Sequence, residues 1–242
     1  LMYTAGFTGA QLELIEKEAS FHCLRNSIPS ITQDILIEQI NRIKYGEKLS
    51  YLSPEQMFEE TAIYESGRAI ISKILMPHIH IEHVSLTPKE NNEHFVAHNY
   101  DDVQDNMTIK DFKDRICVSL AGRTAQIKKF GEIDGLDTGA SNDLQQATRD
   151  AYKAIAHYGM DKNVGFINLN GVKDAKGDTL STKDTKHFHD KIDNALKAWV
   201  DEGQLDVKEL VEKHWEQITK LSQALLEQEI IYSDQLDKII ES

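Results

Sequence analysis

Helix-start signals and apolar residues at helical spacing recur along nearly all of this 242-residue chain, and they restrict it to a mainly α-helical fold. The strongest signal lies at Ser53-Pro54-Glu55-Gln56, which combines an N-cap serine, a proline at the first helical position and a glutamine three residues after the cap. We expect a helix from there to about Met76, where Pro77 follows.

The other helices are predicted from the same kinds of signal. Residues 1–46 predict two helices, the first capped by Thr8 with Gln11 and the second by Ser30 or Thr32, ending at Gly46. A third helix is predicted from Asn106 or Thr108 to about Lys129, closed by Gly131, and a fourth has Asn142 as its N-cap. Another is predicted from Ser181 or Thr182 to Gly203. The last two are a helix that begins with an Asp206–Glu209 capping box and runs to about Gln228, and a short helix capped by Ser233. A polar, glycine-containing loop is expected over 161–180.

One β-hairpin is expected, with strands over 83–87 and 94–98 around a turn-rich link over 88–92. Histidines are frequent in and around it: His78, His80, His83, His94 and His98. His94 and His98 share one face of a strand, but their Cα atoms would be about 13 Å apart, too far to bind one ion. We expect solvated or hydrogen-bonded histidines, with a metal site as the alternative.

Composition excludes several classes of function. The net charge is −13, with acidic residues spread along the chain, which argues against direct contact with nucleic acid or an anionic membrane. Cys23 and Cys117 are too few for a disulfide framework, so a reducing compartment is expected. No apolar run approaches 18 residues and no signal peptide is visible. Residues 1–5 are expected to mark a boundary inside a longer protein.

The helix predicted over 54–76 contains Tyr64-Glu65-Ser66-Gly67-Arg68, which has the spacing of the zinc-peptidase motif His-Glu-x-x-His but lacks both histidines. Glu65 occupies the position of the general base. Tyr64 and Arg68 occupy the ligand positions, although a phenol with a pKa near 10 is a poor ligand and a guanidinium has no lone pair to offer. Standing alone, this segment would be an ordinary stretch of helix.

Its neighbours resemble the FtsH family of membrane-anchored, ATP-dependent zinc proteases. Residues 58–69 (FEETAIYESGRA) resemble the family's AYHEAGHA, and residues 120–126 (LAGRTAQ) resemble LGGRAAE. Residues 138–148 (TGASNDLQQAT) are similar to TGAxNDLxxAT, and residues 157–160 (HYGM) to the end of the same helix. Residues 6–25 resemble GFSGADLxxLxNEAAxxAAR, from the end of an AAA+ ATPase module. The segments keep the family's order and spacing.

The resemblance implies an FtsH peptidase-domain-like helical fold with a small β-hairpin or sheet, preceded by the end of an AAA+ helical lid. It places the lid at 1–46, a linker at 47–53 and the peptidase-like domain at 54–242. It makes Asp143 a retained zinc-ligand position, although an acidic residue in a first helical turn is also explained by the helix dipole. It makes Val84, Ser85 and Leu86 an edge strand that pairs with an extended substrate. Gln126 replaces a family glutamate.

Loss of both histidines predicts a pseudoprotease in which Arg68 pairs with Asp143 or Glu65 in place of the metal. Two alternatives remain open: an active metallopeptidase with other ligands, such as the hairpin histidines, and a scaffold subunit in a ring with active homologues. Because the chain contains no G-x-x-x-x-G-K-[ST] loop, these residues should not hydrolyse ATP.

We expect no cofactor in this part of the protein, with zinc in active relatives and ATP with magnesium in an AAA+ core outside these residues. The resemblance implies a hexamer, of one or of several FtsH-like subunits, that handles protein or peptide substrates. It also implies the cytoplasmic domain of a protein anchored in the inner membrane of a bacterium or organelle, with no membrane contact by these residues.

Overall fold

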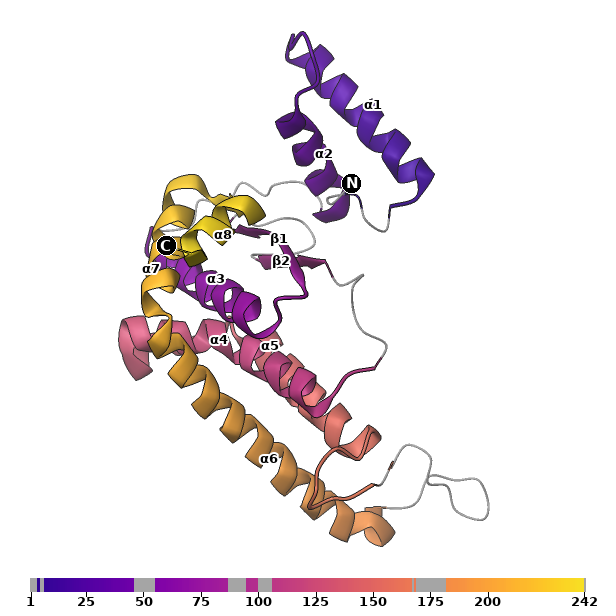
Figure 1. Ribbon diagram of the computed structural model, residues 1–242, viewed down its shortest axis with the longest axis vertical. Helices are drawn as coiled ribbons and strands as arrows, with labels where there is room; N and C mark the ends of the chain where they lie inside the picture. The colour runs from indigo at the N-terminus through magenta and orange to yellow at the C-terminus, as the bar shows by residue number, and fades with distance from the viewer. Residues whose placement is uncertain are drawn as a thin grey trace.

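The computed structural model describes residues 4, 7–45, 55–86, 95–99, 106–166, 168 and 182–241. The fold is mainly α-helical, as predicted, with one small antiparallel sheet (Figure 1). The helices are α1 (Gly9–Arg25), α2 (Gln33–Tyr45), α3 (Glu55–Leu75), α4 (Ile109–Asp134), α5 (Ser141–Tyr152) with its π-helical continuation η3 (Lys153–His157), α6 (Thr182–Lys213), α7 (Trp215–Gln228) and α8 (Ser233–Glu241). The strands are β1 (His80–Ser85), β2 (Phe95–Asn99) and β3 (Ile230–Tyr232).

The described residues form a large helical body and a separate N-terminal hairpin. In Figure 1 the α1–α2 hairpin projects from the body, and β1 lies on the side of the body that faces α2. The body has an extensive core in which α3 packs against α4 and α7, and α4 against α6. The hairpin has its own small cluster of buried residues, Ala19, Cys23 and Ile35. The two parts therefore bury their apolar surface largely independently.

Capping boxes define where two of the helices begin, one at the predicted box and one at a predicted helix start. Thr8 and Gln11 form the one at α1, and Thr108, with Asp111 three residues later, caps α4. Thr32 rather than Ser30 caps α2, since its Oγ1 accepts a hydrogen bond of 3.4 Å from the Ile35 amide. The start predicted at Ser53 and the linker over 47–53 lie outside the described residues, as does most of the loop over 161–180.

The prediction that a helix ends at Gly203 is wrong, because α6 continues through Gly203 and Asp206 to Lys213. The glycine is required for packing, since a Cβ built there would lie 2.8 Å from Ile116 Cγ2 on α4. The chain breaks instead at His214, which precedes α7. Here a glycine that allows close helix packing has the same sequence signature as one that ends a helix.

One other predicted boundary differs from the structure, and the predicted helix stop at Gly131 is present as a break within α4. The N-cap of α5 is Ala140, without a side-chain hydrogen bond, so Asn142 lies inside the helix and not at its cap. Gly131 has a φ of 88° and ψ of 171°, which breaks the helical path within α4 before the chain turns to its end at Asp134. Asp143 stays in the first turn of α5, as predicted.

The sheet has the order β2-β1-β3, so the predicted hairpin strands pair but a third strand joins them. The edge-strand prediction for Val84, Ser85 and Leu86 is therefore wrong. Val84 lies opposite Val96 of β2 and Ile231 of β3, and Ser85 is likewise paired on both sides. The Leu86 amide donates a 2.9 Å hydrogen bond to the Glu229 carbonyl. Because all three residues are buried and paired by the chain itself, β1 offers no free edge there.

Candidate functional site

The candidate site lies where α3 meets α4 and the first turn of α5. Two glycines allow this approach. A Cβ at Gly67 would lie 2.7 Å from Ala125 Cβ, and a Cβ at Gly122 would lie 2.8 Å from the Tyr64 ring. The Tyr64 ring therefore packs directly on the α4 backbone, at the glycine of the LAGRTAQ segment. This packing directs Tyr64, Glu65 and Arg68 of α3 toward the start of α5.

Asp143 and the three α3 side chains form one connected polar cluster. The Tyr64 hydroxyl donates a short hydrogen bond to Asp143 Oδ2. Arg68 Nε lies 3.5 Å from the same oxygen, and Arg68 Nη1 donates a hydrogen bond of 3.3 Å to Glu65 Oε2. The guanidinium thus lies between the two carboxylates, in the pairing predicted from the sequence, and it pairs with both of them.

Burial changes the acidity of two of these groups. Glu65 is 2% exposed, and burial raises its pKa from 4.5 to about 7 against the lowering effect of the Arg68 charge, with a smaller rise from Asp143. Burial, followed by the nearby Asp143 charge, raises the pKa of Tyr64 far above its usual value of 10. The phenol therefore remains a proton donor to Asp143 at every physiological pH.

These residues do not fit a zinc ion. Zinc sites in proteins use neutral imidazole, thiolate and carboxylate groups that direct lone pairs at the metal. Here a protonated phenol and a guanidinium occupy the two motif positions. The phenol donates a hydrogen bond to the Asp143 oxygen that a metal would need, and the guanidinium charge lies 3.5 Å from it. The cluster is held together by hydrogen bonding and charge pairing.

Among the described side chains, which include those of His78, His80 and His83 but not of His94 or His98, the hairpin histidines form no group that could hold a metal ion. His83 of β1 is buried and lies opposite Ala97, whereas His98 of β2 lies opposite Ile81. His94 lies outside the described residues. No group of three His, Cys, Asp or Glu side chains in the described part of the chain is close enough together to hold a metal ion.

A cavity of about 560 Å³ adjoins Arg68 and Asp143 and extends between α4 and α5. One part of its lining is apolar and includes two methionines, Met76 and Met107. Its polar part contains an ion pair that the sequence did not predict, with Arg115 Nε 3.0 Å from Asp150 Oδ2. Gln146, one turn before Asp150, donates a hydrogen bond of 2.9 Å to the same oxygen. The i, i+4 spacing of Gln146 and Asp150 was a sequence signal for this hydrogen bond, but not for the ion pair with Arg115.

Gln126 has a structural role beside the site. Its side-chain amide lies 3.4 Å from the Glu60 carbonyl oxygen and 3.3 Å from Asp137 Oδ2, and the residue is 4% exposed. Both partners are acceptors, so a buried carboxylate in this position would face two oxygens without a proton to share. The amide instead links α3 to the loop that leads into α5.

Comparison with known proteins identifies the family of the chain. The pattern that defines peptidase family M41 matches residues 52–239, which includes the whole site. The chain belongs to peptidase family M41. Among its relatives are the mitochondrial ATP-dependent zinc metalloprotease FTSH 10 of Arabidopsis thaliana, 27% identical over 98% of this chain and 28% of that protein, and ATP-dependent zinc metalloprotease FtsH 1 of Thermoanaerobacter sp. (strain X514), 27% identical over 98% of this chain and 39% of that protein.

A third relative, ATP-dependent zinc metalloprotease FtsH of Parabacteroides distasonis, is 29% identical over 98% of the M41 chain and 34% of its own length. The chain thus spans about a third of the length of such relatives, whose names include mitochondrial, chloroplastic and bacterial proteins. In the part of the chain that the structure describes, no helix is long and apolar enough to cross a membrane.

Proposed function

We propose that this M41 chain is a pseudoprotease: a peptidase-like domain of an FtsH-type, ATP-dependent protease homologue that does not cleave peptide bonds. The observation that supports this most directly is the Arg68 guanidinium between Glu65 and Asp143. A zinc peptidase needs a cation there that polarises the scissile carbonyl and activates water. A guanidinium supplies the positive charge without an open coordination position.

The cluster would serve to keep the former catalytic site folded. Glu65 and Asp143 are acidic groups packed close together, and without a cation between them their charges would repel. Arg68 compensates both charges, while Tyr64 donates a hydrogen bond to Asp143. This explains how the α3–α4–α5 packing can be stable without zinc.

The proposed setting is a hexameric ring of identical or mixed FtsH-like subunits, in which this chain has a structural or regulatory role toward protein substrates. The support is the family membership and the names of the relatives, all ATP-dependent proteases. In this setting residues 1–46 are the end of an AAA+ lid, 47–53 a linker and 54–242 the peptidase-like domain. The whole protein would be anchored in a bacterial or organellar inner membrane, with this part on the cytoplasmic or equivalent side.

Metal content and casein cleavage test the proposal together. The chain is purified without a histidine tag, loaded with zinc, dialysed and examined by mass spectrometry for metal and by fluorescent casein for cleavage. We expect neither retained zinc nor chelator-sensitive cleavage. One firmly held equivalent of zinc with chelator-sensitive cleavage would overturn the proposal and favour an active peptidase with other ligands, and the hairpin histidines would be the first candidates.

Restoring the motif provides a second, positive test. The double variant Tyr64→His/Arg68→His places two imidazoles on α3 at the positions that face Asp143. It should therefore bind zinc that the parent chain is expected not to retain. The matched control, Tyr64→Phe/Arg68→Gln, removes the same two groups without adding ligands and should gain none. If the histidine variant folds and does not bind zinc, the frame is not that of a former zinc site.

The second candidate function, a scaffold subunit in a mixed ring, makes a different prediction. It requires that the chain co-assemble with a catalytically active homologue. Co-purification of tagged chain with an active FtsH-type subunit from the same cell, in rings of fixed composition, would favour it. Rings containing this chain alone would favour the homomeric form.

A further inference from the structure

An ion pair joins the N-terminal hairpin to the sheet of the body. Lys44, in the last turn of α2, places Nζ 2.7 Å from Oε1 of Glu82, in the middle of β1. The lysine side chain is 16% exposed and the glutamate side chain 2% exposed. A surface pair is screened by water and salt, but this pair is largely shielded from both.

The local structure of β1 directs Glu82 toward α2. The register between β1 and β2 shifts between Ile81, opposite His98, and His83, opposite Ala97. Glu82 is the residue at this irregularity, and extra residues of this kind change the direction of a side chain relative to a regular strand. The carboxylate therefore lies at an irregularity in the pairing of β1 with β2.

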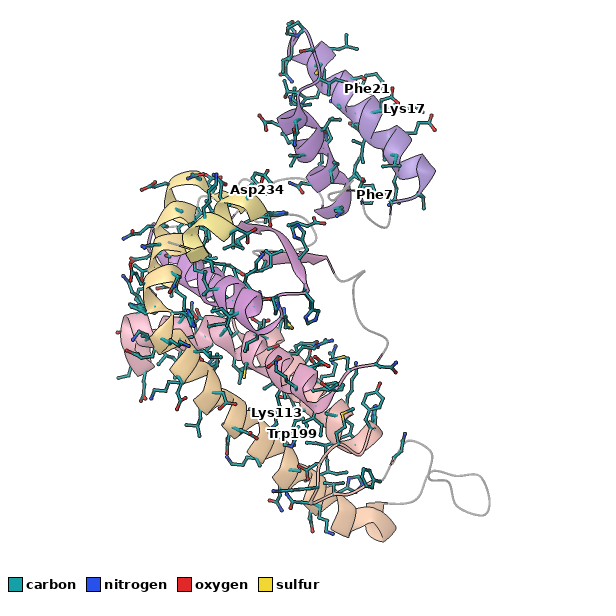
Figure 2. The ribbon with its side chains drawn as sticks, viewed as in Figure 1. Phe7, Lys17, Phe21, Lys113, Trp199 and Asp234 are labelled. Carbon is teal, nitrogen blue, oxygen red and sulfur yellow. The ribbon has the colours of Figure 1, made fainter. Side chains whose placement is uncertain are left out.

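On the hairpin side, the Lys44 ammonium has a second contact, with an aromatic ring. The Lys44 ammonium lies 5.3 Å from the centre of the Phe7 ring, so the cation contacts an aromatic face as well as the carboxylate. Figure 2 labels Phe7 beside the end of α2 that points toward the sheet. Phe7 precedes α1, so both ends of the hairpin converge on the same lysine.

We propose that Lys44 and Glu82 form a latch that holds the α1–α2 hairpin in one orientation against the sheet. The hairpin has its own small core, and its chain connection to the body passes through residues 46–54. Breaking the latch leaves a buried carboxylate without this cation, so the closed orientation is favoured over a range of orientations. The latch does not depend on whether the peptidase site binds zinc.

The test measures the distance between the hairpin and the body. Spin labels at Glu16→Cys on α1 and Asn194→Cys on α6, both exposed positions, report this distance by pulsed electron resonance. Cys23 and Cys117 are buried, and the chain without added cysteines shows whether they take up label. We expect one narrow distance distribution for the parent chain and loss of that single peak in Lys44→Met.

Three further variants make the outcome decisive. Glu82→Gln removes the charge without stranding a carboxylate, so it should also lose the single peak even if Lys44→Met folds poorly. The exchange Lys44→Glu/Glu82→Lys should recover part of it. Lys73→Met breaks a pair of the same 2.7 Å length, Lys73–Asp237, inside the body and should keep the peak. A narrow, unshifted peak in both Lys44→Met and Glu82→Gln, or equal broadening in Lys73→Met, would overturn the proposal.

Discussion

Glu65 has an environment that departs strongly from that of an ordinary glutamate. It is buried, its pKa is raised from 4.5 to about 7, and its cationic partner is Arg68. The folded chain therefore holds the Glu65 proton more tightly than the unfolded chain does. Stability from this group is fully present below about pH 4.5 and is lost as the pH rises toward 7.

Glu65→Gln should remove this pH dependence, because glutamine resembles the protonated acid in shape and charge. We expect the variant to match the parent chain near pH 5 and to be more stable by about 2–3 kcal/mol at pH 8, at the 1.36 kcal/mol that corresponds to one pKa unit. Urea unfolding at both pH values measures the difference. A gap between variant and parent that is the same at pH 5 and pH 8 would contradict the raised pKa.

Tyr64→Phe tests the hydrogen bond to Asp143 separately. The ring keeps its packing on Gly122, and only the hydroxyl is removed. A hydrogen bond to a charged group contributes about 1.5–3 kcal/mol, and because Asp143 is partly exposed, water can replace some of it. We expect a loss of about 1–2 kcal/mol in urea unfolding. Tyr152→Phe, at a half-exposed tyrosine on α5, is the control and should change stability little.

Among the elements, the close contact between α3 and α4 positions the side chains of the candidate site. It is tight because Gly67 of α3 lies against Ala121 and Ala125 of α4. A Cβ at Gly67 would lie 2.9 Å from the Ala121 carbonyl oxygen, which is backbone and cannot rotate away. At Gly203 of α6 the nearest atom is Ile116 Cγ2, at 2.8 Å, which belongs to a side chain.

Alanine substitution should therefore show which of the two helix contacts loses more stability when a methyl group is added. Gly67→Ala should be the more damaging change, and Gly203→Ala should cost about 1–3 kcal/mol, since overpacking opposes the gain in helix propensity. Gly9→Ala, where nothing lies within 4 Å, should be neutral or slightly stabilising. Thermal unfolding of the three variants gives the order. Equal effects at Gly9 and Gly67 would show that the helices do not approach as described.

Elements were predictable from the sequence where their cause is local. The capping box at Thr8 and the helix start at Thr108 depend on residues within three positions of the cap, and both are present as predicted. The continuity of α6 depends on Ile116, far away in the sequence, and β3 has three residues, too few for an alternating pattern. The missed β3 pairs with the segment that the resemblance made an edge strand.

Within the site, some contacts were predictable from the sequence and others were not. Tyr64, Glu65, Arg68 and Asp143 could be brought together from the family resemblance, and the pairing of Arg68 with the carboxylates followed from charge, whereas the Tyr64–Asp143 hydrogen bond was not predicted. The Arg115–Asp150 pair could not, because each residue taken alone resembles a solvated charge on a helix. A buried pair between two helices is visible only once their facing sides are known.

At the scale of the whole molecule, the described residues differ greatly in how much apolar surface supports them. The hairpin core consists of Ala19, Cys23 and Ile35, whereas the body core draws on every helix and strand from α3 to α8 and includes Ile63, Ile116 and Leu221. Opening free energies within one protein range from near zero to the global value, and a segment with few buried contacts lies at the low end. The hairpin should therefore open without the body.

Hydrogen exchange measures this directly. Amides in the middle of α1 and α2 should exchange well before those in α3 and α4, although all four helices have intact hydrogen bonds, because only the latter are held by the large core. Lys44→Met should speed exchange in β1 around Glu82 without changing α4, since the latch joins β1 to the hairpin and α4 lies beyond it. Uniform exchange across α1–α4 would instead mean that hairpin and body unfold as one cooperative unit, and the small core would then be stabilised by contacts with the rest of the chain.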